Sequence, residues 1–301
     1  MLRSAGLTCA LLAACARAPT TATYEARDAR ITMAVGTSTR GYIVHVPARP
    51  ALGRFLPLVM VFHGLGQTAE LIQQQTGLDA VADRAGFIVV YPESVIGRWD
   101  VTGEFVEYYG FDDMAFTRTL MQRMTDEYHA NPQRIYATGL SNGAVFAERL
   151  ACEMTDQFAG FIAVAGTMSR PARDRCFPSR PISGLYIIGS RDNQFPADGN
   201  DVVLSIDSTM MFWGKQNRCA ERGSRTALPD TARDGTLVFR SRFLSCTNGE
   251  AIELDSIVNG QHSWPGQVNP VNANAAAATS RNLSANEEIA RFVMEGRARP
   301  R

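Results

Sequence analysis

The chain has 301 residues, of which 45% are hydrophobic and 20% charged, a composition that is typical of folded globular proteins and excludes the collagen-like and disordered classes. Thirty basic and thirty acidic side chains give a formal net charge of zero, so no overall field attracts nucleic acid or an anionic membrane surface. We therefore predict a neutral or apolar ligand and no nucleic-acid partner.

The first residues predict export. A basic start precedes a short apolar run at 5–14, which is typical of a secretory signal and too short to cross a bilayer as a mature helix. We place the signal at residues 1–18 and a small, polar tether at 19–30. The mature protein is then expected to be periplasmic or secreted.

Cys15 ends a segment, Leu12–Cys15, that resembles a bacterial lipobox, in which the cysteine becomes the lipidated first residue. Small residues also sit at the offsets needed for cleavage after Ala16 or Ala18, and this is the alternative. A lipid anchor at Cys15 is the one membrane association that the sequence predicts.

Four of the six cysteines lie outside the predicted signal. An even number in an exported chain predicts two disulfides. The local pairs Cys152 with Cys176 and Cys219 with Cys246 are expected, because each joins neighbouring segments. Buried free thiols are the alternative, and a metal site is disfavoured because no close cysteine pair is present.

Short apolar runs alternate with amphipathic patterns along the rest of the chain. The predicted strands are 42–46, 58–62, 87–91, 135–138, 161–164, 185–188 and 252–258. The predicted helices are 69–85, 113–129, 144–153 and one opened by a capping box from Ser284 to Glu287. This alternation predicts an α/β fold with a mostly parallel sheet covered by helices on both faces. We expect a single domain over 31–296, with a surface loop at 269–280.

Residues Gly139 to Gly143 match the pattern G-x-S-x-G, with Ser141 at its centre. The match falls where a predicted strand turns into a predicted helix, as in the nucleophile elbow of α/β-hydrolases. The glycines are needed because this turn crowds backbone against backbone. An ordinary tight turn is the alternative, and we interpret Ser141 as a nucleophile.

A serine hydroxyl needs a nearby imidazole to remove its proton. In this fold the acid and then the base follow the nucleophile in the chain, and His262 is the one histidine after Ser141. Asp192 directly follows the strand predicted at 185–188, where it could orient that imidazole. A turn-initiating role is the alternative for Asp192.

Two backbone N–H groups are expected to bind the oxyanion of the tetrahedral intermediate. Asn142 follows the nucleophile, and Leu65 lies in the loop after the third strand, the positions from which this fold supplies the two donors. His63 is interpreted as a residue that shapes this loop without transferring protons. No metal or organic cofactor is implied, because side chains and backbone donors complete the chemistry.

These motifs, in this order, resemble the exported feruloyl esterase and polyhydroxybutyrate depolymerase-like branch of the α/β-hydrolases, also described as esterases of the lipoprotein C type. The resemblance spans roughly Gly41 to Gly296 and is carried by residues 134–143, 158–166, 189–192 with Pro196, and 262–266. It implies the same two disulfides. The family commonly has glycine at the positions of Gln261 and Ala144, and often cysteine at that of Leu65.

The resemblance implies a serine carboxylesterase that acts on feruloyl or acetyl esters of polysaccharides or on hydroxyalkanoate-type esters. Trp99, Tyr108 and Trp264, together with Tyr109, are candidate aromatic walls for the substrate, with core packing as the alternative. An acyltransferase or a peptidase with the same triad, and a non-catalytic exported lipoprotein, are the alternative functions.

Overall fold

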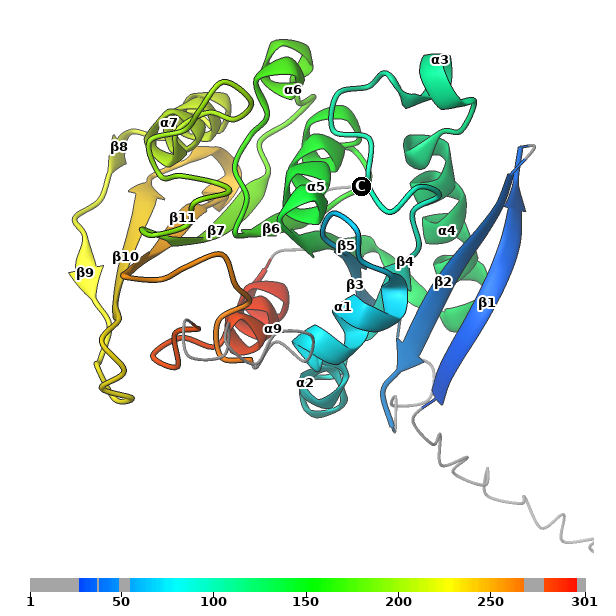
Figure 1. Ribbon diagram of the computed structural model, residues 1–301, viewed down its shortest axis with the longest axis horizontal. Coiled ribbons are helices and arrows are strands. Elements are labelled where there is room, and N and C mark those ends of the chain that lie inside the picture. Colours follow the sequence, from blue (N-terminus) through cyan, green and yellow to red (C-terminus); the bar gives the residue numbers. More distant parts are fainter. Residues whose placement is uncertain (1–26, 37, 49–54, 268–278, 297–301) are drawn as a thin grey trace, which may run out of the picture.

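The computed structural model describes residues 27–36, 38–48, 55–267 and 279–296, in which one central sheet carries helices on both faces (Figure 1). The strands are β1 (Arg27–Val35), β2 (Ser38–Val46), β3 (Leu56–Phe62), β4 (Ile88–Pro92), β5 (Ala130–Leu140), β6 (Gly160–Val164), β7 (Ser183–Gly189), β8 (Glu221–Arg222), β9 (Thr226–Ala227), β10 (Leu237–Leu244) and β11 (Ile252–Val258). The helices are α1 (Ala69–Thr76), α2 (Leu78–Ala85), α3 (Phe105–Tyr109), α4 (Asp113–Tyr128), α5 (Asn142–Glu153), α6 (Arg170–Arg175), α7 (Ile206–Gln216) and α9 (Ala285–Glu295), with a 3₁₀ turn at Thr247–Gly249.

The strands lie in the order β1-β2-β4-β3-β5-β6-β7-β11-β10-β8, and β9 pairs with β10. From β4 to β11 all neighbouring strands are parallel, whereas β1, β2 and β10 run antiparallel to their neighbours. The predicted mostly parallel sheet is therefore confirmed. Because parallel strands run the same way, the carboxyl ends of β3, β5, β7 and β11 open on one edge of the sheet.

Two buried clusters, one on each face, fix the sheet between its helices. Along β3 successive side chains alternate between the faces: Met60 and Phe62 pack in the cluster shared with α4, α5 and α7, whereas Val59 and Val61 pack in the cluster shared with α1, α2 and α9. These two sets of helices lie on opposite sides of the sheet (Figure 1). Each such side chain contributes about 1.5–3 kcal/mol by its burial, so a register slip would be costly.

Three details differ from the sequence predictions. The helix expected over 69–85 is two helices, because Gly77 adopts a left-handed conformation (φ 55°) and its N–H caps α1 at Gln73 O. β1 begins at Arg27, so the last residues of the expected tether belong to the sheet. The elements that were not predicted are β1, β8, β9, β10, α3, α6 and α7. The N-cap half of the predicted capping box is confirmed, since Ser284 Oγ accepts the Glu287 N–H, whereas the Glu287 carboxylate pairs with Arg84.

Both predicted disulfides are present, one between Cys152 and Cys176 and the other between Cys219 and Cys246. The predicted signal with Cys15, the tether up to residue 26 and the loop at 269–278 lie outside the described residues. Within the described residues, no helix is long and apolar enough to cross a membrane.

Candidate active site

Ser141 occupies the turn between β5 and α5. Its backbone angles are φ 59° and ψ −122°, a region that is costly for a residue with a side chain and is found mostly at functional sites. Its N–H donates to Val164 O of the neighbouring strand at 3.0 Å, which fixes the turn against the sheet. The strand, turn and helix that the motif requires are therefore all present.

Gly143 allows α5 to start immediately beside β3. A Cβ atom at this position would lie 2.6 Å from His63 O and closer still to Phe62 O, both backbone atoms that cannot swing away. The same crowding occurs at Gly139, where a Cβ would lie 2.5 Å from the carbonyl carbon of Gly143. The glycines of the motif thus bring the amino end of α5 against the loop that contains Leu65.

His262 and Asp192 form a hydrogen-bonded pair, with 2.7 Å between Nδ1 of the ring and Oδ2 of the carboxylate. The other carboxylate oxygen, Oδ1, accepts the N–H groups of Gln194 and Phe195 at 2.9 and 2.8 Å. A carboxylate can only accept, so Nδ1 carries the proton and Nε2 is left free to accept another. This is the tautomer that a general base for a serine hydroxyl needs.

The loops that carry this pair are joined along their backbones. Arg191 N–H donates to Gly260 O at 2.8 Å, and Ser190 N–H donates to Ile257 O at 2.9 Å. The contact is close because Gly189 has no side chain, and a Cβ there would lie 2.5 Å from the carbonyl carbon of Gly260. Seventy residues separate Asp192 from His262 in the chain, and these loop contacts bring them together.

The register of the sheet places all three predicted residues at one edge. Leu140 of β5 is level with Val164 of β6, which is level with Ile187 of β7, and Gly189 is level with Ile257 of β11. Ser141 follows β5, Asp192 follows β7 and His262 follows β11. Within the described residues Ser141 Oγ makes no hydrogen bond to His262. Such catalytic hydrogen bonds are often long before a substrate binds.

The two predicted oxyanion donors are available. The N–H groups on either side of Leu65 already donate hydrogen bonds within the protein, that of Gly64 to Gln67 Oε1 at 2.8 Å and that of Gly66 to Gly97 O at 2.7 Å. The Leu65 N–H has no acceptor among the described residues. Asn142 is the first residue of α5, where an N–H has no acceptor inside the helix. The partial positive charge of a helix amino end also favours an anion here.

His63 is completely buried, and its ring is held by the backbone. Ser94 N–H donates to Nε2 at 3.2 Å, so Nδ1 carries the proton and donates to Gly64 O at 2.8 Å. Burial lowers the pKa of His63 to about 4, which keeps the ring neutral at pH 7. These contacts support the interpretation that His63 shapes the loop and transfers no proton.

The candidate aromatic walls fall into two groups. Trp99 and Trp264 are fully buried, and their indole N–H groups donate to His63 O and Asn286 Oδ1, so these rings pack inside the protein and are not open to a substrate. Tyr108 and Tyr109 of α3 are 68% and 49% exposed. Tyr108 therefore stays a candidate contact, whereas the two tryptophans have the packing role that was the alternative.

Sequence reasoning did not identify Phe195, whose ring lies parallel to that of His262, with centroids 5.8 Å apart and planes inclined by 10°. Its N–H also binds Asp192 Oδ1. Phe195 therefore limits the orientations open to the imidazole. A single phenylalanine in a polar loop carries no sequence signal for this role, which depends on the meeting of two loops.

A cluster of one histidine and two aspartates lies at the opposite edge of the sheet. Within the described residues, ligand atoms of Asp28, His45 and Asp79 lie within 4.8 Å of one another. His45 Nδ1 is 2.6 Å from Asp28 Oδ1. Burial lowers the pKa of His45, but the hydrogen bond to Asp28 and the nearby aspartates outweigh it and raise this pKa above its ordinary value. Because His45 is level with Val89 near the start of β4, the cluster is remote from Ser141 and connects β1 to the rest of the sheet.

Comparison with known sequences identifies the family of the chain. The family model described as Esterase PHB depolymerase matches residues 40–171. The putative esterase NocK of Nocardia uniformis subsp. tsuyamanensis is 32% identical over 294 residues, which cover 91% of this chain and 84% of NocK. Feruloyl esterase B of Piromyces equi is 23% identical, with 74% of this chain and 42% of that protein covered. Poly(3-hydroxyalkanoate) depolymerase C of Paucimonas lemoignei is 30% identical, with 40% and 30% covered. The chain thus spans less than half the length of the last two.

Among solved structures, an acetyl xylan esterase from Aspergillus awamori superposes with a TM-score of 0.59 over 79% of this chain and 94% of that one, at 15% identity. The feruloyl esterase module from Clostridium thermocellum gives 0.53 over 86% and 89%, at 13% identity. At these identities the likeness is one of fold. It confirms the predicted α/β-hydrolase fold.

Proposed function

This chain belongs to the PHB depolymerase family of esterases and is a carboxylic ester hydrolase, and we propose that it cleaves its substrates through an acyl-enzyme formed on Ser141. The observation that carries the proposal is the combination, at one edge of the sheet, of a serine on a strained strand-to-helix turn with the His262–Asp192 pair. Each part is needed by acyl transfer, and ordinary folding requires none of them.

In the proposed acylation step, His262 Nε2 takes the proton of the Ser141 hydroxyl while Oγ attacks the ester carbonyl carbon. The carbonyl π electrons move onto oxygen, and the resulting oxyanion accepts hydrogen bonds from the N–H groups of Leu65 and Asn142. When this intermediate collapses, the bond from carbon to the alcohol oxygen breaks and the imidazolium returns its proton to the departing alcohol. Asp192 stabilises the imidazolium throughout.

Deacylation repeats these steps with water. His262 removes a proton from a water molecule, and the resulting hydroxide attacks the acyl carbon and releases the carboxylic acid. The proton returns to Ser141 Oγ. Every proton and electron pair is accounted for by the residues named, so the proposed chemistry needs no cofactor.

The proposed substrates are neutral esters, either feruloyl or acetyl esters of polysaccharides or hydroxyalkanoate-type esters. The names of the related proteins include both classes. The zero formal net charge of the chain supports an uncharged substrate. Tyr108, exposed on α3, is the proposed aromatic contact.

We also propose that the protein is exported. Two disulfides support an oxidising compartment, and the apolar run at 5–14 supports a secretory signal. Lipidation of Cys15 would anchor the protein to a membrane, whereas cleavage after Ala18 would release it. Mass spectrometry of the mature amino terminus distinguishes these forms.

Labelling by a fluorophosphonate tests the nucleophile. The wild type is expected to be labelled, whereas the Ser141→Ala variant is not. Ser263→Ala is the matched control, because Ser263 lies next to His262 but its hydroxyl donates weakly to Gln261 O at 3.4 Å, and this variant is expected to label normally. A folded wild type that takes up no label would contradict the proposal and favour a non-catalytic protein.

Rates with p-nitrophenyl acetate, methyl ferulate and a peptide anilide test the substrate class. Hydrolysis of the two esters with no turnover of the anilide is the expected result. Preferential cleavage of the anilide would indicate a peptidase. Transfer of the acyl group to an added alcohol in preference to water would indicate an acyltransferase.

A further inference from the structure

We infer that Trp99 is a positioning residue for the oxyanion hole, because it holds together the two segments that supply the proposed donors. The inference rests on the proposed function. Trp99 is fully buried and so cannot contact a substrate, yet it touches both the end of β3 and the start of α5. Its contacts to each segment are specific and directional.

The first set of contacts joins Trp99 to Asn142. The Trp99 N–H donates to Asn142 Oδ1 at 2.7 Å, and Asn142 Nδ2 donates to Trp99 O at 3.3 Å. The side chain of Asn142 thus holds both polar backbone groups of Trp99, while its own backbone N–H is one of the two proposed donors. The amino end of α5 cannot shift relative to Trp99 without breaking two partly buried hydrogen bonds.

The second set of contacts joins Trp99 to the segment before Leu65. The indole N–H donates to His63 O at 3.0 Å, two residues before the Leu65 N–H. The indole ring also meets Phe62 edge to face at 5.0 Å between centroids. It also stacks on Phe146 of α5 at 5.2 Å and 16°. Phe62 and Phe146 also meet each other directly, with 5.1 Å between centroids. The indole therefore packs against a direct contact of β3 with α5, and its hydrogen bonds fix the two donor segments relative to each other.

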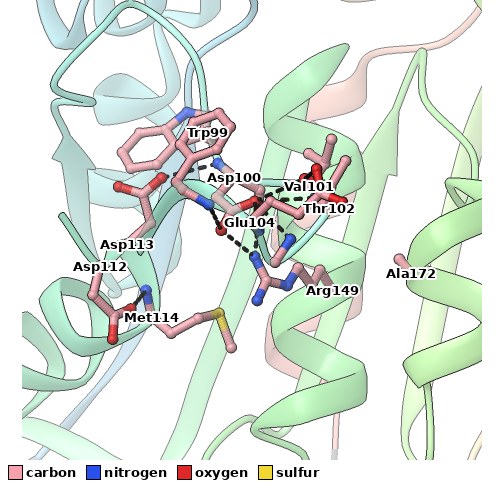
Figure 2. Close-up of polar contacts among 12 residues, drawn as sticks. Trp99, Asp100, Val101, Thr102, Glu104, Asp112, Asp113, Met114, Arg149 and Ala172 are labelled. Atoms are coloured by element: carbon pink, nitrogen blue, oxygen red, sulfur yellow. Dashed lines mark hydrogen bonds and ion pairs between the residues drawn. The ribbon is translucent and has the colours of Figure 1, made fainter. Parts of the chain in front are cut away.

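The segment that carries Trp99 is itself fixed to α5 and α4, as Figure 2 shows. Arg149 Nη1 donates to Asp100 O at 2.6 Å and lies 3.1 Å from Asp100 Oδ2. Asp100 N–H donates to Asp113 Oδ2 of α4 at 2.9 Å. Arg149 is two turns beyond Asn142 on α5. The helix therefore holds both Trp99 and the residue that follows it, so the position of the indole ring is fixed.

The consequence for catalysis is geometric. Oxyanion donors act only when they lie about 2.7–3.1 Å from the position that the oxygen reaches. If the indole N–H is removed, His63 O loses its donor and the Leu65 segment is free to relax away from Asn142. Substrate binding, which does not use the oxyanion, is unaffected. The loss therefore falls on kcat and spares KM.

The variants Trp99→Phe and Trp213→Phe test this inference as a matched pair. Both tryptophans are fully buried, and each loses one indole hydrogen bond, that of Trp213 being to Glu148 Oε1 at 2.7 Å. Both variants are expected to lose stability. Only Trp99→Phe is expected to lower kcat on p-nitrophenyl acetate, on the order of tenfold, with KM within about twofold of the wild type, because one donor is displaced and not deleted.

Inhibition by an aryl trifluoromethyl ketone reports directly on the oxyanion site, because the adduct that the ketone forms with serine carries a negative charge on oxygen at that site. The inhibition constant is expected to rise in Trp99→Phe by about the factor by which kcat/KM falls, and to stay at the wild-type value in Trp213→Phe. Asn142→Ala keeps its backbone N–H but releases Trp99, so it should show the same pattern. The double variant Trp99→Phe/Asn142→Ala should lose less than the product of the two single losses.

Wild-type kcat in a folded Trp99→Phe, with unchanged inhibition by the ketone, would overturn the inference while leaving the proposed function intact. Equal losses of kcat in Trp99→Phe and Trp213→Phe would also overturn it, since they would report general destabilisation. A folded wild type that is neither labelled by a fluorophosphonate nor active on esters would overturn the proposed function, and this inference with it.

Discussion

Glu148 is a carboxyl group that the proposed reaction does not use, and its environment predicts a large effect of pH on stability. It lies on α5, is 1% exposed, and has Tyr186 OH and Trp213 Nε1 as donors to a single oxygen, Oε1. The other oxygen, Oε2, has no hydrogen-bond partner. Burial raises the pKa of Glu148 from 4.5 to about 7, although the two hydrogen bonds oppose this.

The sign of the effect follows from the two states. In the unfolded chain the carboxyl loses its proton near its ordinary pKa of 4.5, whereas in the folded protein it keeps the proton until about pH 7. Stability is therefore greatest below pH 4.5 as far as this group is concerned, and falls as the pH rises from 4.5 to 7. At about 1.4 kcal/mol per tenfold change in proton affinity, the loss is about 3 kcal/mol.

The variant Glu148→Gln removes the charge but keeps an oxygen for Tyr186 and Trp213. We compare the free energy of unfolding of this variant with that of the wild type. We expect the difference, variant minus wild type, to be about 3 kcal/mol larger at pH 8 than at pH 4.5. The assay is urea unfolding of both proteins at intervals across this range, with the disulfides intact. Glu107→Gln changes the same charge at an exposed position of α3, and its curve should run parallel to that of the wild type. A pH-independent difference between Glu148→Gln and the wild type would refute the reasoning.

Three other variants test the site and its support. Asp192→Asn is expected to lower kcat by about 10³–10⁴-fold, because the amide stabilises the wrong tautomer of the imidazole. The control Asp198→Asn, on the exposed part of the same loop, should change kcat less than twofold. Equal losses of kcat in the two variants would remove Asp192 from the triad. Gly143→Ala places a Cβ 2.6 Å from His63 O and should lower both the melting temperature and, by about 100-fold, kcat/KM; full activity would show that α5 can move away from β3 without harm. Replacing Cys152 and Cys176 together by serine removes a disulfide between residues 24 apart in the chain. The free energy of unfolding, measured by urea unfolding, should fall by about 3 kcal/mol. An unchanged value would mean that this disulfide does not constrain the unfolded chain.

Some elements were missed because their charges are balanced only in the folded protein. β10 contains Arg240 and Arg242 within an apolar pattern, which argues against a buried strand when the sequence is considered alone. In the sheet these residues are level with Asp255 and Glu253 of β11, and each forms an ion pair with its opposite neighbour at 2.7 Å. Cross-strand pairs of opposite charge stabilise a sheet, but their register is a property of two strands.

The sequence by itself determined the fold class, the serine turn, the chain order of the proposed triad and the two disulfide pairs. These follow from local patterns, such as the glycines around Ser141 and the placement of His262 after the last parallel strand. The direction in which an aromatic side chain points depends on what packs around it, and only the tertiary structure decided this. Trp99 was a candidate substrate contact in the sequence, and the structure buries it against Phe62 of β3 and Phe146 of α5. Phe195 gave no signal, yet it stacks on His262 because two loops distant in the chain meet at the edge of the sheet.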